Sequence, residues 1–374
     1  MVADTVKDAG VDHQVLNALG ERIDQLVSLD VSSRGVIATL HALVREKVGK
    51  PLCLAAARLL ADRVRPGDVV LLATGQPDRP TINPGISESD GPPGAAALAR
   101  ALHRGLDAVP IVLCEDALVP GVGAVMQAAD FRIVTPDEAI ECVAGKLRSV
   151  AAQAADISSV GLGLHSPIHG AAVLGFPIDE AEARARASKI IAAYRPAAVV
   201  TIEKGGMNDR GVMFGTRGTE IAAGDVAKID YLVREAAARG IATIGVGDGG
   251  NEIGFGIVED GIKRLIPYGA QARIEGKGGI AAHTATDVMV AAAISNWGGY
   301  GIAACLAGLL GNPDVFHTPA VEERLLGESA RASFIDGVTG YVAPSADGLP
   351  LPVHQAFVTL MGETVRRAVA RMKR

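Results

Sequence analysis

The sequence of 374 residues is poor in aromatic side chains, since Phe, Trp and Tyr together make up 3% of it. Proteins that bind single-stranded nucleic acid stack bases on aromatic rings, so the sequence does not predict such a surface. Its charges do not suit nucleic acid either, because 36 basic residues are set against 42 acidic ones and no Lys/Arg run forms a basic stripe. We therefore expect no nucleic-acid partner.

Cysteine is scarce as well. The four cysteines lie far apart and form no C-x-x-C pair, which excludes a zinc signature and a disulfide framework and is typical of a reducing compartment. The N-terminal segment MVADTVKDAGVDHQ lacks the basic-then-apolar pattern of an export signal. These two observations predict a cytoplasmic protein.

Long uninterrupted apolar runs are also lacking. The most apolar stretch near the C-terminus, residues 287–310, has the length of a membrane helix but is interrupted by Ser295, Asn296, Trp297 and glycines. We interpret this stretch as a buried helix and expect no membrane partner.

Hydrophobic residues and glycine, by contrast, are abundant. Hydrophobic residues make up 49% of the sequence, which is enough for a large core and excludes a disordered chain. The 45 glycines indicate tight loops at strand ends. A chain this apolar is also compatible with a homodimer.

Short β-branched runs alternate with helical runs along the chain, which predicts an α/β fold with a mostly parallel sheet flanked by helices, Rossmann-like and doubly wound. The predicted strands are residues 69–74, 109–114, 131–135, 158–164, 197–203 and 241–247, and the predicted helices are residues 51–64, 95–106, 122–129, 178–194 and 226–240. Residues 1–50 are expected to form a helical lead-in to a domain of residues 51–374. A division of this domain into two lobes near residue 150 is a further expectation.

Ligands of open parallel sheets bind beyond the carboxyl ends of the strands, which directs attention to three loops. The first follows Thr74 and places Glu88 and Asp90 just before a predicted helix. Asp90 as an N-cap would account for this placement. The alternative is that Glu88 or Asp90 faces a substrate ammonium or a metal ion.

The second loop begins with Glu203 and Lys204 at a strand end. Adjacent side chains of a strand point to opposite faces, so we expect one of the two to reach the site, unless both form a surface charge pair. Arg217 is a candidate clamp for a carboxylate because its guanidinium binds in a bidentate way.

The third loop, GVGDGGNEIGFG, formally matches the dinucleotide pattern G-x-G-x-x-G. Asp248 lies within the segment whose amides would have to cradle a pyrophosphate, and its charge opposes that anion. Gly254 and Gly256 weaken the helix that the pattern requires. We therefore interpret the loop as a site for something other than a dinucleotide, with a purely structural glycine turn as the alternative.

Asp248, Asn251 and Glu252 form a carboxylate–amide–carboxylate set that suits a cationic or zwitterionic ligand. Gly249 and Gly250 would let the backbone come close to such a ligand. The same acids, together with Asp90 and with Asp336 in a later turn, are candidate ligands for Mg²⁺ or Mn²⁺. Trp297 is typical of a core aromatic residue, but it and Asn296 are also candidate substrate contacts.

Five motifs in this order resemble the D-glutamate cyclase family, and within it the C-terminal domain of the mammalian mitochondrial enzyme. The resemblance covers residues from about 20 to 347, and the motifs are RGV (34–36), ESDGPPGAAALARAL (88–102), IGVGDGGNEIGFG (244–256), SNWGGYG (295–301) and DGVTG (336–340). It implies a lyase that reversibly dehydrates D-glutamate to 5-oxo-D-proline. The mammalian enzyme carries an additional N-terminal hydro-lyase-like domain, and we expect this chain to stand alone.

Ring closure requires a base for the substrate ammonium, stabilisation of an oxyanion and a proton for the departing oxygen. We assign candidate catalytic roles to Asp248, Glu252, Glu203 and Lys204. The candidate substrate-binding residues are Glu88, Asp90, Gly249, Gly250, Asn251, Arg217, Asn296 and Trp297, and the candidate metal ligands are Asp248, Glu252 and Asp336. No cofactor is firmly predicted. Two alternatives are a metal-dependent hydrolase or isomerase of another small amino or hydroxy acid, and a non-catalytic module that binds a small molecule.

Overall fold

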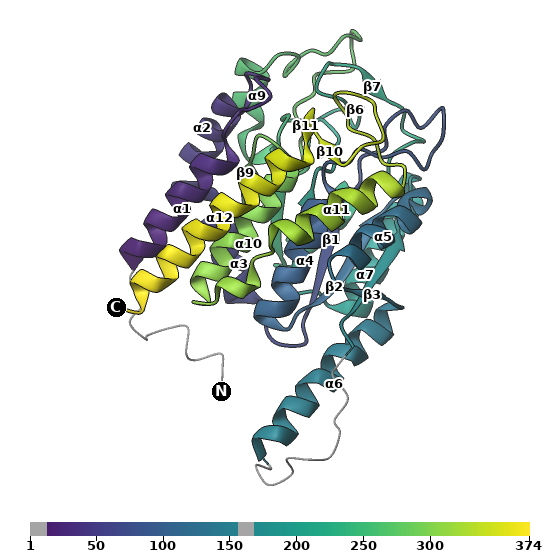
Figure 1. The fold of residues 1–374 in the computed structure, drawn as a ribbon. Coiled ribbons are helices and arrows are strands. Elements are labelled where there is room, and N and C mark those ends of the chain that lie inside the picture. Colours follow the sequence, from purple (N-terminus) through teal and green to yellow (C-terminus); the bar gives the residue numbers. More distant parts are fainter. Residues whose placement is uncertain (1–12, 156–167) are drawn as a thin grey trace.

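The computed structural model describes residues 13–155 and 168–374, and its main feature is one sheet of seven parallel strands. The strands lie in the order β3-β4-β2-β1-β5-β8-β9 (Figure 1), and each pair of neighbours is parallel. They are β1 (Val69–Ala73), β2 (Val109–Cys114), β3 (Arg132–Ile133), β4 (Gly170–Gly175), β5 (Ala198–Ile202), β8 (Ala242–Gly247) and β9 (Val288–Ala291). The predicted α/β class is thus confirmed.

Helices cover both faces of the sheet. One face carries α1 (His13–Val27), α2 (Ile37–Val48), α3 (Leu52–Arg63), α4 (Pro92–Leu106), α5 (Val119–Ala128), α10 (Ser295–Leu309), α11 (Pro319–Arg331) and α12 (Leu351–Met372). The other carries α6 (Pro136–Ala155), α7 (Glu180–Tyr194) and α8 (Ile229–Ala238). A short helix, α9 (Glu259–Leu265), and the 3-10 turns η1 (Asp116–Leu118), η2 (Gly256–Val258) and η3 (Pro313–Val315) lie in the connections.

The strands are continuous apolar runs because each of their faces is buried. In β1, Val70 and Leu72 join the core under α4 and α10, whereas Val69, Leu71 and Ala73 join the core under α7 and α8. All five residues of this strand are buried. A strand covered on both faces gains hydrophobic stabilisation from every side chain, which is why its sequence does not alternate.

Most predicted elements are confirmed within a few residues, but the prediction for residues 287–310 is wrong and that for residues 158–164 lies outside the described residues. Residues 287–310 do not form a single buried helix; they contain β9, a short loop and α10. A run that is apolar throughout has no periodicity that distinguishes a buried strand from a buried helix, which explains the error. The strand predicted at residues 158–164 lies outside the described residues, and β4 at Gly170–Gly175 was not predicted.

The direction in which successive strands are added to the sheet changes at β1. The chain moves from β1 to β2 on one side of the sheet and later returns to place β5 on the other side of β1. Loops that leave the carboxyl ends of β1 and β5 therefore diverge, which is the usual ligand position in such sheets. Two hairpins, β6–β7 (Met213–Phe214 and Glu220–Ile221) and β10–β11 (Ser345–Ala346 and Leu349–Pro350), lie at the upper end of the molecule in Figure 1.

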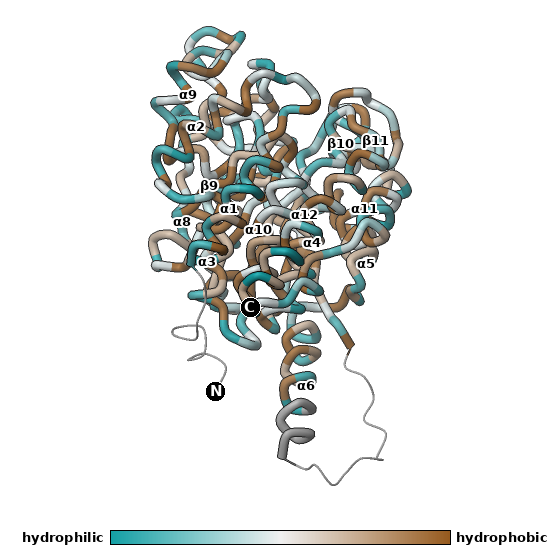
Figure 2. Tube along the Cα trace, turned by 60° about the vertical axis from the view of Figure 1, so that its left-hand side comes forward, coloured by the Kyte–Doolittle hydropathy of each residue, from teal (hydrophilic) through white to brown (hydrophobic). Residues whose placement is uncertain are grey.

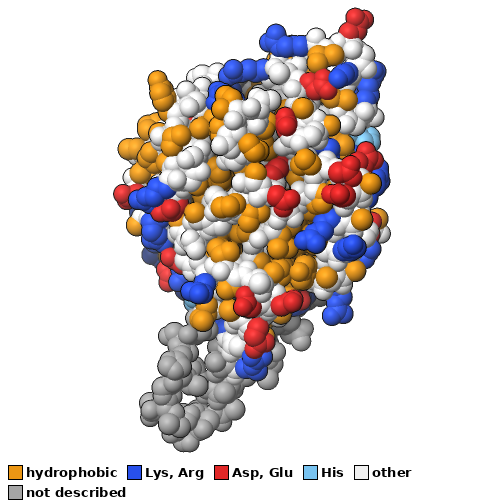
Figure 3. Space-filling model, turned by 90° about the vertical axis from the view of Figure 1, so that its right-hand side faces the viewer, with side chains coloured by type: hydrophobic (Ala, Val, Ile, Leu, Met, Phe, Trp, Pro, Cys, Tyr) orange, Lys and Arg blue, Asp and Glu red, His pale blue; other side chains and the backbone are white. Residues whose placement is uncertain are grey.

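The remaining surface features concern α6 and the distribution of charge. Figures 1 and 2 show α6 extending away from the rest of the molecule. On the face in Figure 3, acidic and basic side chains are interspersed among hydrophobic ones. Within the described residues, no helix combines the length and the apolar character that a membrane crossing would need.

Helix α10 lies at the centre of its layer and packs closely through small residues. A methyl group added at Gly301 would lie 2.6 Å from Cys53 Sγ of α3 and 2.9 Å from Val27 Cγ1 of α1. Both neighbours are completely buried, so neither can move away freely. The helices α1 and α3 can approach α10 at this distance because residue 301 has no side chain.

We therefore predict that Gly301→Ala lowers the free energy of unfolding by about 1–3 kcal/mol, because overpacking outweighs the gain in helix propensity. Gly327→Ala in α11 is the matched control, since the nearest atom to an added methyl group there is Arg331 Nη1 at 3.9 Å. The control should stabilise the protein by about 0.5–1 kcal/mol. Urea unfolding measures both values, and a stabilising Gly301→Ala would contradict this account of the packing.

Candidate active site

Three buried carboxylates meet at the carboxyl edge of the sheet. Asp90, Glu203 and Asp248 each offer one oxygen atom, and these atoms lie within 4.8 Å of one another. Asp90 ends the loop after β1, Glu203 follows β5 directly and Asp248 follows β8 directly. We call these three residues the acidic cluster. The fold brings them together because β1, β5 and β8 are consecutive in the sheet.

Asp90 and Asn296 hold the N-termini of two helices together. The Asp90 carboxylate accepts hydrogen bonds from the backbone N–H groups of Ser295 (2.8 Å) and Asn296 (2.7 Å), in the first turn of α10. In return, Asn296 Oδ1 accepts from the N–H groups of Gly91 (2.9 Å) and Gly94 (2.7 Å), at the start of α4. Each side chain thus caps the other's helix, which satisfies donors that a helix leaves unpaired.

Glu203 adopts a left-handed backbone conformation, with φ at 48°, directly after β5. Its Oε2 accepts a hydrogen bond from Ser295 Oγ at 2.5 Å. The approach is possible because residue 91 is glycine: a methyl group there would lie 2.9 Å from Glu203 Cβ and 2.8 Å from Thr74 Oγ1. Burial, followed by the charges of neighbouring acids including Asp248, raises the pKa of Glu203 well above its usual value.

Arg34 is the cation that contacts the cluster. Its Nη1 and Nη2 both donate to the Asp248 carboxylate, the latter at 3.1 Å, and Nη1 also donates to Asp347 Oδ2 at 2.9 Å. Asp248, above all other neighbours, raises the pKa of Arg34, so the guanidinium stays charged. With 24% of its side chain exposed, Arg34 connects the buried acids to the surface.

The Glu252 carboxylate is directed to its own loop. Oε1 accepts from the N–H groups of Asp248 (3.1 Å) and Gly249 (2.9 Å), and Oε2 accepts from that of Gly250 (2.9 Å). The amides that a glycine-rich loop would offer to a phosphate are therefore already bonded to a carboxylate of the same loop. Glu252, a candidate catalytic residue and metal ligand from the sequence, positions Asp248 in this structure.

Lys204 and Glu203 point to different surroundings. Lys204 Nζ is completely buried and donates to Glu115 Oε1 (2.6 Å), Glu115 Oε2 (2.7 Å) and the carbonyl of Gly75 (2.6 Å). Glu115 Oε1 also accepts from the N–H of Ala227 at 2.8 Å. Lys204 thus joins the ends of β1, β2 and β5, and the structure does not bring its ammonium into the acidic cluster.

Glu88 adds another carboxyl group beside the cluster. Burial, followed by the charges of Asp78, Asp248 and Asp90, raises the pKa of Glu88 to about 8. Burial and then Asp248 raise the pKa of Asp90 to about 7, and the same two causes raise that of Glu252 to about 8. The site therefore holds more buried acids than Arg34 can neutralise, which favours binding of protons or of a cationic ligand.

Two buried polar atoms near these acids have no hydrogen-bond partner within the described residues, namely Thr74 Oγ1 and Asn251 Oδ1. The Asn251 amide does have one contact, since Nδ2 donates to the carbonyl of Phe214 at 3.0 Å. Buried polar atoms are rarely left unpaired in native proteins. Such orphaned atoms are what a bound polar ligand would satisfy.

Three other candidates from the sequence lie apart from the acidic cluster or are otherwise engaged. The Trp297 ring stacks on Phe357 at 3.8 Å between centroids, and its Nε1 donates to His354. Arg217 is exposed on the turn between β6 and β7. Asp336 accepts backbone N–H groups of its own turn and of the β10–β11 hairpin, from Val338, Thr339 and Gly348.

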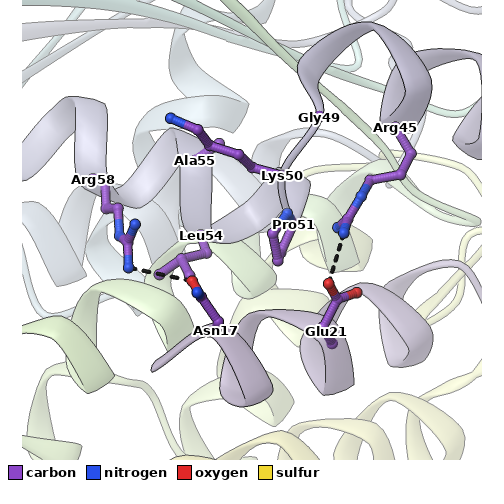
Figure 4. A pocket seen from close by; sticks show the side chains of 9 residues that line it. All are labelled: Asn17, Glu21, Arg45, Gly49, Lys50, Pro51, Leu54, Ala55 and Arg58. Atoms are coloured by element: carbon purple, nitrogen blue, oxygen red, sulfur yellow. Dashed lines mark hydrogen bonds and ion pairs between the residues drawn. The ribbon is translucent and has the colours of Figure 1, made fainter. Parts of the chain in front are cut away.

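A hollow of about 280 Å³ lies elsewhere, between α1, α2 and α3 (Figure 4). Its two arginines have partners, because Arg45 donates to Glu21 at 2.6 Å and Arg58 donates to Asn17 at 3.4 Å. It shares no lining residue with the acidic cluster. The chemistry described above is therefore not concentrated in this hollow.

Sequence reasoning missed Arg34, Ser295 and Asp347 as members of the site. Arg34 was visible only as part of the RGV motif, and no strand-end argument points to it because it precedes α2. Asp347 lies in the turn between β10 and β11, about 100 residues after Asp248. Asp347 pairs with Arg34, which is 313 residues away in the sequence. A pair of opposite charges that far apart leaves no local pattern.

The raised pKa values predict how stability depends on pH. Asp90, Glu88 and Glu252 bind protons more tightly in the folded state than in the unfolded chain, so the stability that these three acids contribute is fully present below about pH 4 and is lost as pH rises to about 8. We expect the free energy of unfolding, measured with urea and EDTA, to fall by about 1–2 kcal/mol or more between pH 5.5 and 8.

Glu88→Gln should reduce this loss, because no hydrogen bond to its carboxylate is present within the described residues and the amide does not titrate. Glu46→Gln on the exposed side of α2 is the control and should leave the pH dependence unchanged. Stability that rises between pH 5.5 and 8 would show that these acids are ionised at little cost.

Comparisons with known proteins bear on this site. A family model described as D-glutamate cyclase-like, C-terminal, matches residues 23–362. The human protein D-glutamate cyclase, mitochondrial, is 31% identical over 174 residues, which cover 41% of this chain and 27% of the human protein. The resemblance predicted from the five motifs is confirmed by these matches. The chain belongs to the D-glutamate cyclase-like C-terminal family.

Proposed function

We propose that this protein is a lyase that interconverts D-glutamate and 5-oxo-D-proline with release or uptake of water. The observation that carries the proposal is the acidic cluster of Asp90, Glu203 and Asp248, buried beside the Arg34 guanidinium. Its excess of acids suits the ammonium group of an amino acid, and Arg34 suits a carboxylate. The family match and the human relative named D-glutamate cyclase support this substrate.

The first step requires removal of a proton from the substrate ammonium, so that its nitrogen can attack the side-chain carboxyl carbon. Asp90 has a pKa raised to about 7, which places it near the best value for a base at neutral pH. Two backbone N–H groups of α10 hold its carboxylate in place. We assign Asp90 the role of base and Asp248 the role of holding the ammonium.

The second step requires a proton for the oxygen that leaves as water. Burial, followed by the charges of neighbouring acids, raises the pKa of Glu203 well above its usual value, which favours the protonated carboxyl group that this donation requires. The bond between nitrogen and the carboxyl carbon forms, the nitrogen loses a second proton, and the bond between that carbon and the leaving oxygen breaks. The leaving oxygen gains two protons, one from Glu203 and one that Asp90 took from the ammonium. The second proton from the nitrogen returns to Glu203, so both acids end in their starting protonation states. In the reverse direction Glu203 accepts a proton and Asp90 donates one. Arg34 stabilises negative charge on the substrate carboxylates.

We predict that Asp90→Asn, Glu203→Gln and Asp248→Asn each lower kcat by about 10²- to 10⁴-fold, as expected for loss of a general acid, a general base or the ammonium site. The assay follows D-glutamate and 5-oxo-D-proline by chiral chromatography, with L-glutamate in parallel. Asp62→Asn on the exposed side of α3 is the matched control and should keep full activity.

Near-UV circular dichroism checks the fold of each variant. Full turnover by Glu203→Gln and Asp248→Asn would contradict the assigned roles. Binding of D-glutamate by the unsubstituted protein without any turnover would instead identify a non-catalytic binding module.

A metal-assisted reaction on another small amino or hydroxy acid is the second candidate. Three carboxylate oxygens within 4.8 Å form a hard donor set that Mg²⁺ or Mn²⁺ prefers, and the unpartnered Thr74 Oγ1 lies beside Glu203. Asp90, Glu203 and Asp248 would hold the ion, in place of the set Asp248, Glu252 and Asp336 expected from the sequence. A bound ion would polarise a substrate carbonyl as a Lewis acid.

If this second candidate holds, EDTA abolishes turnover and Mn²⁺ restores it. Electron paramagnetic resonance should then detect one bound Mn²⁺ whose affinity falls about tenfold or more in Glu203→Gln, because one charged ligand is lost. Asp62→Asn again serves as the control. Turnover that is unaffected by EDTA, with no Mn²⁺ bound, would exclude a metal-assisted reaction.

A further inference from the structure

A second group of charged residues surrounds a small cavity near the C-terminal half of α4. The cavity has a volume of about 80 Å³, and its lining residues are Arg100, His103, Arg104, Ala129, Asp130, Phe131 and His169. Arg100 lies about 12 Å along the helix from its first residue, given a rise of about 1.5 Å per residue. The cavity is therefore separate from the acidic cluster, which faces the first turn of α4.

Arg100 is buried with unused hydrogen-bond donors. Only 7% of the residue is exposed. Its Nε donates to Asp130 Oδ2 at 3.1 Å, but the buried Nη1 has no partner among the described residues. Leaving such a donor unpaired in a protein interior is costly, and for a charged group the cost is larger. The unpaired donor calls for an acceptor that the described residues do not provide.

The charges around the cavity are mostly positive. Asp130 is its acidic residue, and Arg324 Nη2 already shares that carboxylate at 2.7 Å. Arg104 is exposed on α4 one turn after Arg100, on the same side of the helix. Arg100 and Arg324 thus share the Asp130 carboxylate, and Arg104 adds a third positive charge nearby. The cavity therefore has an excess of positive charge that an anion would neutralise.

Two histidines complete the lining. His103 Nδ1 lies 3.0 Å from the carbonyl of Ala108, which can only accept, so this nitrogen carries the proton. His103 Nε2 is then the acceptor in the 2.8 Å contact with His169 Nδ1. This leaves His169 Nε2 without a proton in the neutral ring. Protonation of His169 would supply one more donor when an anion is bound.

We propose that this cavity binds a small oxyanion of the phosphate or sulfate class through Arg100 and Arg104. A volume of about 80 Å³ suits a single small oxyanion. The guanidinium donors match the oxygens of such an anion. The inference does not depend on the proposed function, since it uses other residues.

Isothermal titration calorimetry with inorganic phosphate tests the site, with chloride added to hold ionic strength constant. We expect saturable binding of one phosphate per chain. Arg104→Gln should weaken binding by about two- to fivefold, as expected for an exposed charge. Arg100→Lys, which keeps the charge but loses the unpaired Nη1 donor, should weaken it by about tenfold or more. Arg371→Gln, exposed near the end of α12, is the matched control and should bind as the unsubstituted protein does.

Arg100→Lys also loses the contact with Asp130 and could fail to fold, so a second measurement uses the unsubstituted protein. Phosphate should shift the imidazole NMR signals of His103 and His169, whereas chloride at equal ionic strength should not. A response to phosphate that does not saturate, or equal affinities in Arg104→Gln and the unsubstituted protein, would overturn the proposal. Turnover of D-glutamate tests the acidic cluster separately.

Discussion

The exchange of caps between Asp90 and Asn296 is the interaction on which the rest of the site depends. It ties the start of α4 to the start of α10, two helices that are about 200 residues apart in the sequence. Unpaired N–H groups at helix N-termini carry partial positive charge, which makes a buried carboxylate at position 90 tolerable. Glu203 uses the same helix start through Ser295, so one helix end organises two of the three clustered acids.

The site combines a rigid polar framework with a group of acids that the framework does not neutralise. Lys204 and Glu115 form a buried ion pair at the strand ends, and the Glu252 carboxylate accepts hydrogen bonds from the backbone N–H groups of its own loop. Asp90, Glu203 and Asp248 instead lie close together, and within the described residues Arg34 is the cationic side chain that forms an ion pair with the cluster, through Asp248. Repulsion between buried acids lowers the stability of the folded state, and such arrangements are typical of sites where a bound ligand offsets the repulsion. The framework therefore separates acids whose hydrogen bonds or ion pairs hold the loops from the acids to which we assign the proposed reaction.

The sequence was sufficient to predict the strands that position the site and the loops that carry it. β1, β2, β5 and β8 are continuous apolar runs bounded by glycine or charge, which is a strong local signal. Roles within the loops were not predictable in the same way. Asp248 and Glu252 look alike as carboxylates of one glycine loop, and only the backbone path turns Glu252 onto the amides. The sequence offered two interpretations of Asp90, an N-cap of its own helix or a carboxylate facing a ligand. In the structure Asp90 accepts hydrogen bonds from the first turn of α10, and such distant pairs leave no local pattern in the sequence.

The hydrogen bonds between the Glu252 carboxylate and the N–H groups of residues 248–250 bear on how glycine-rich sequence patterns are interpreted. A phosphate that approached residues 248–250 would have to displace a carboxylate attached to the same backbone, which competes intramolecularly for the three amides. The glycine spacing of a nucleotide loop is therefore present here, although the amides of residues 248–250 are already bonded to Glu252. An acidic residue two or three positions after the glycines whose amides it binds, as Glu252 is, offers a simple criterion for separating loops whose amides bind their own carboxylate from loops whose amides are free to bind a ligand.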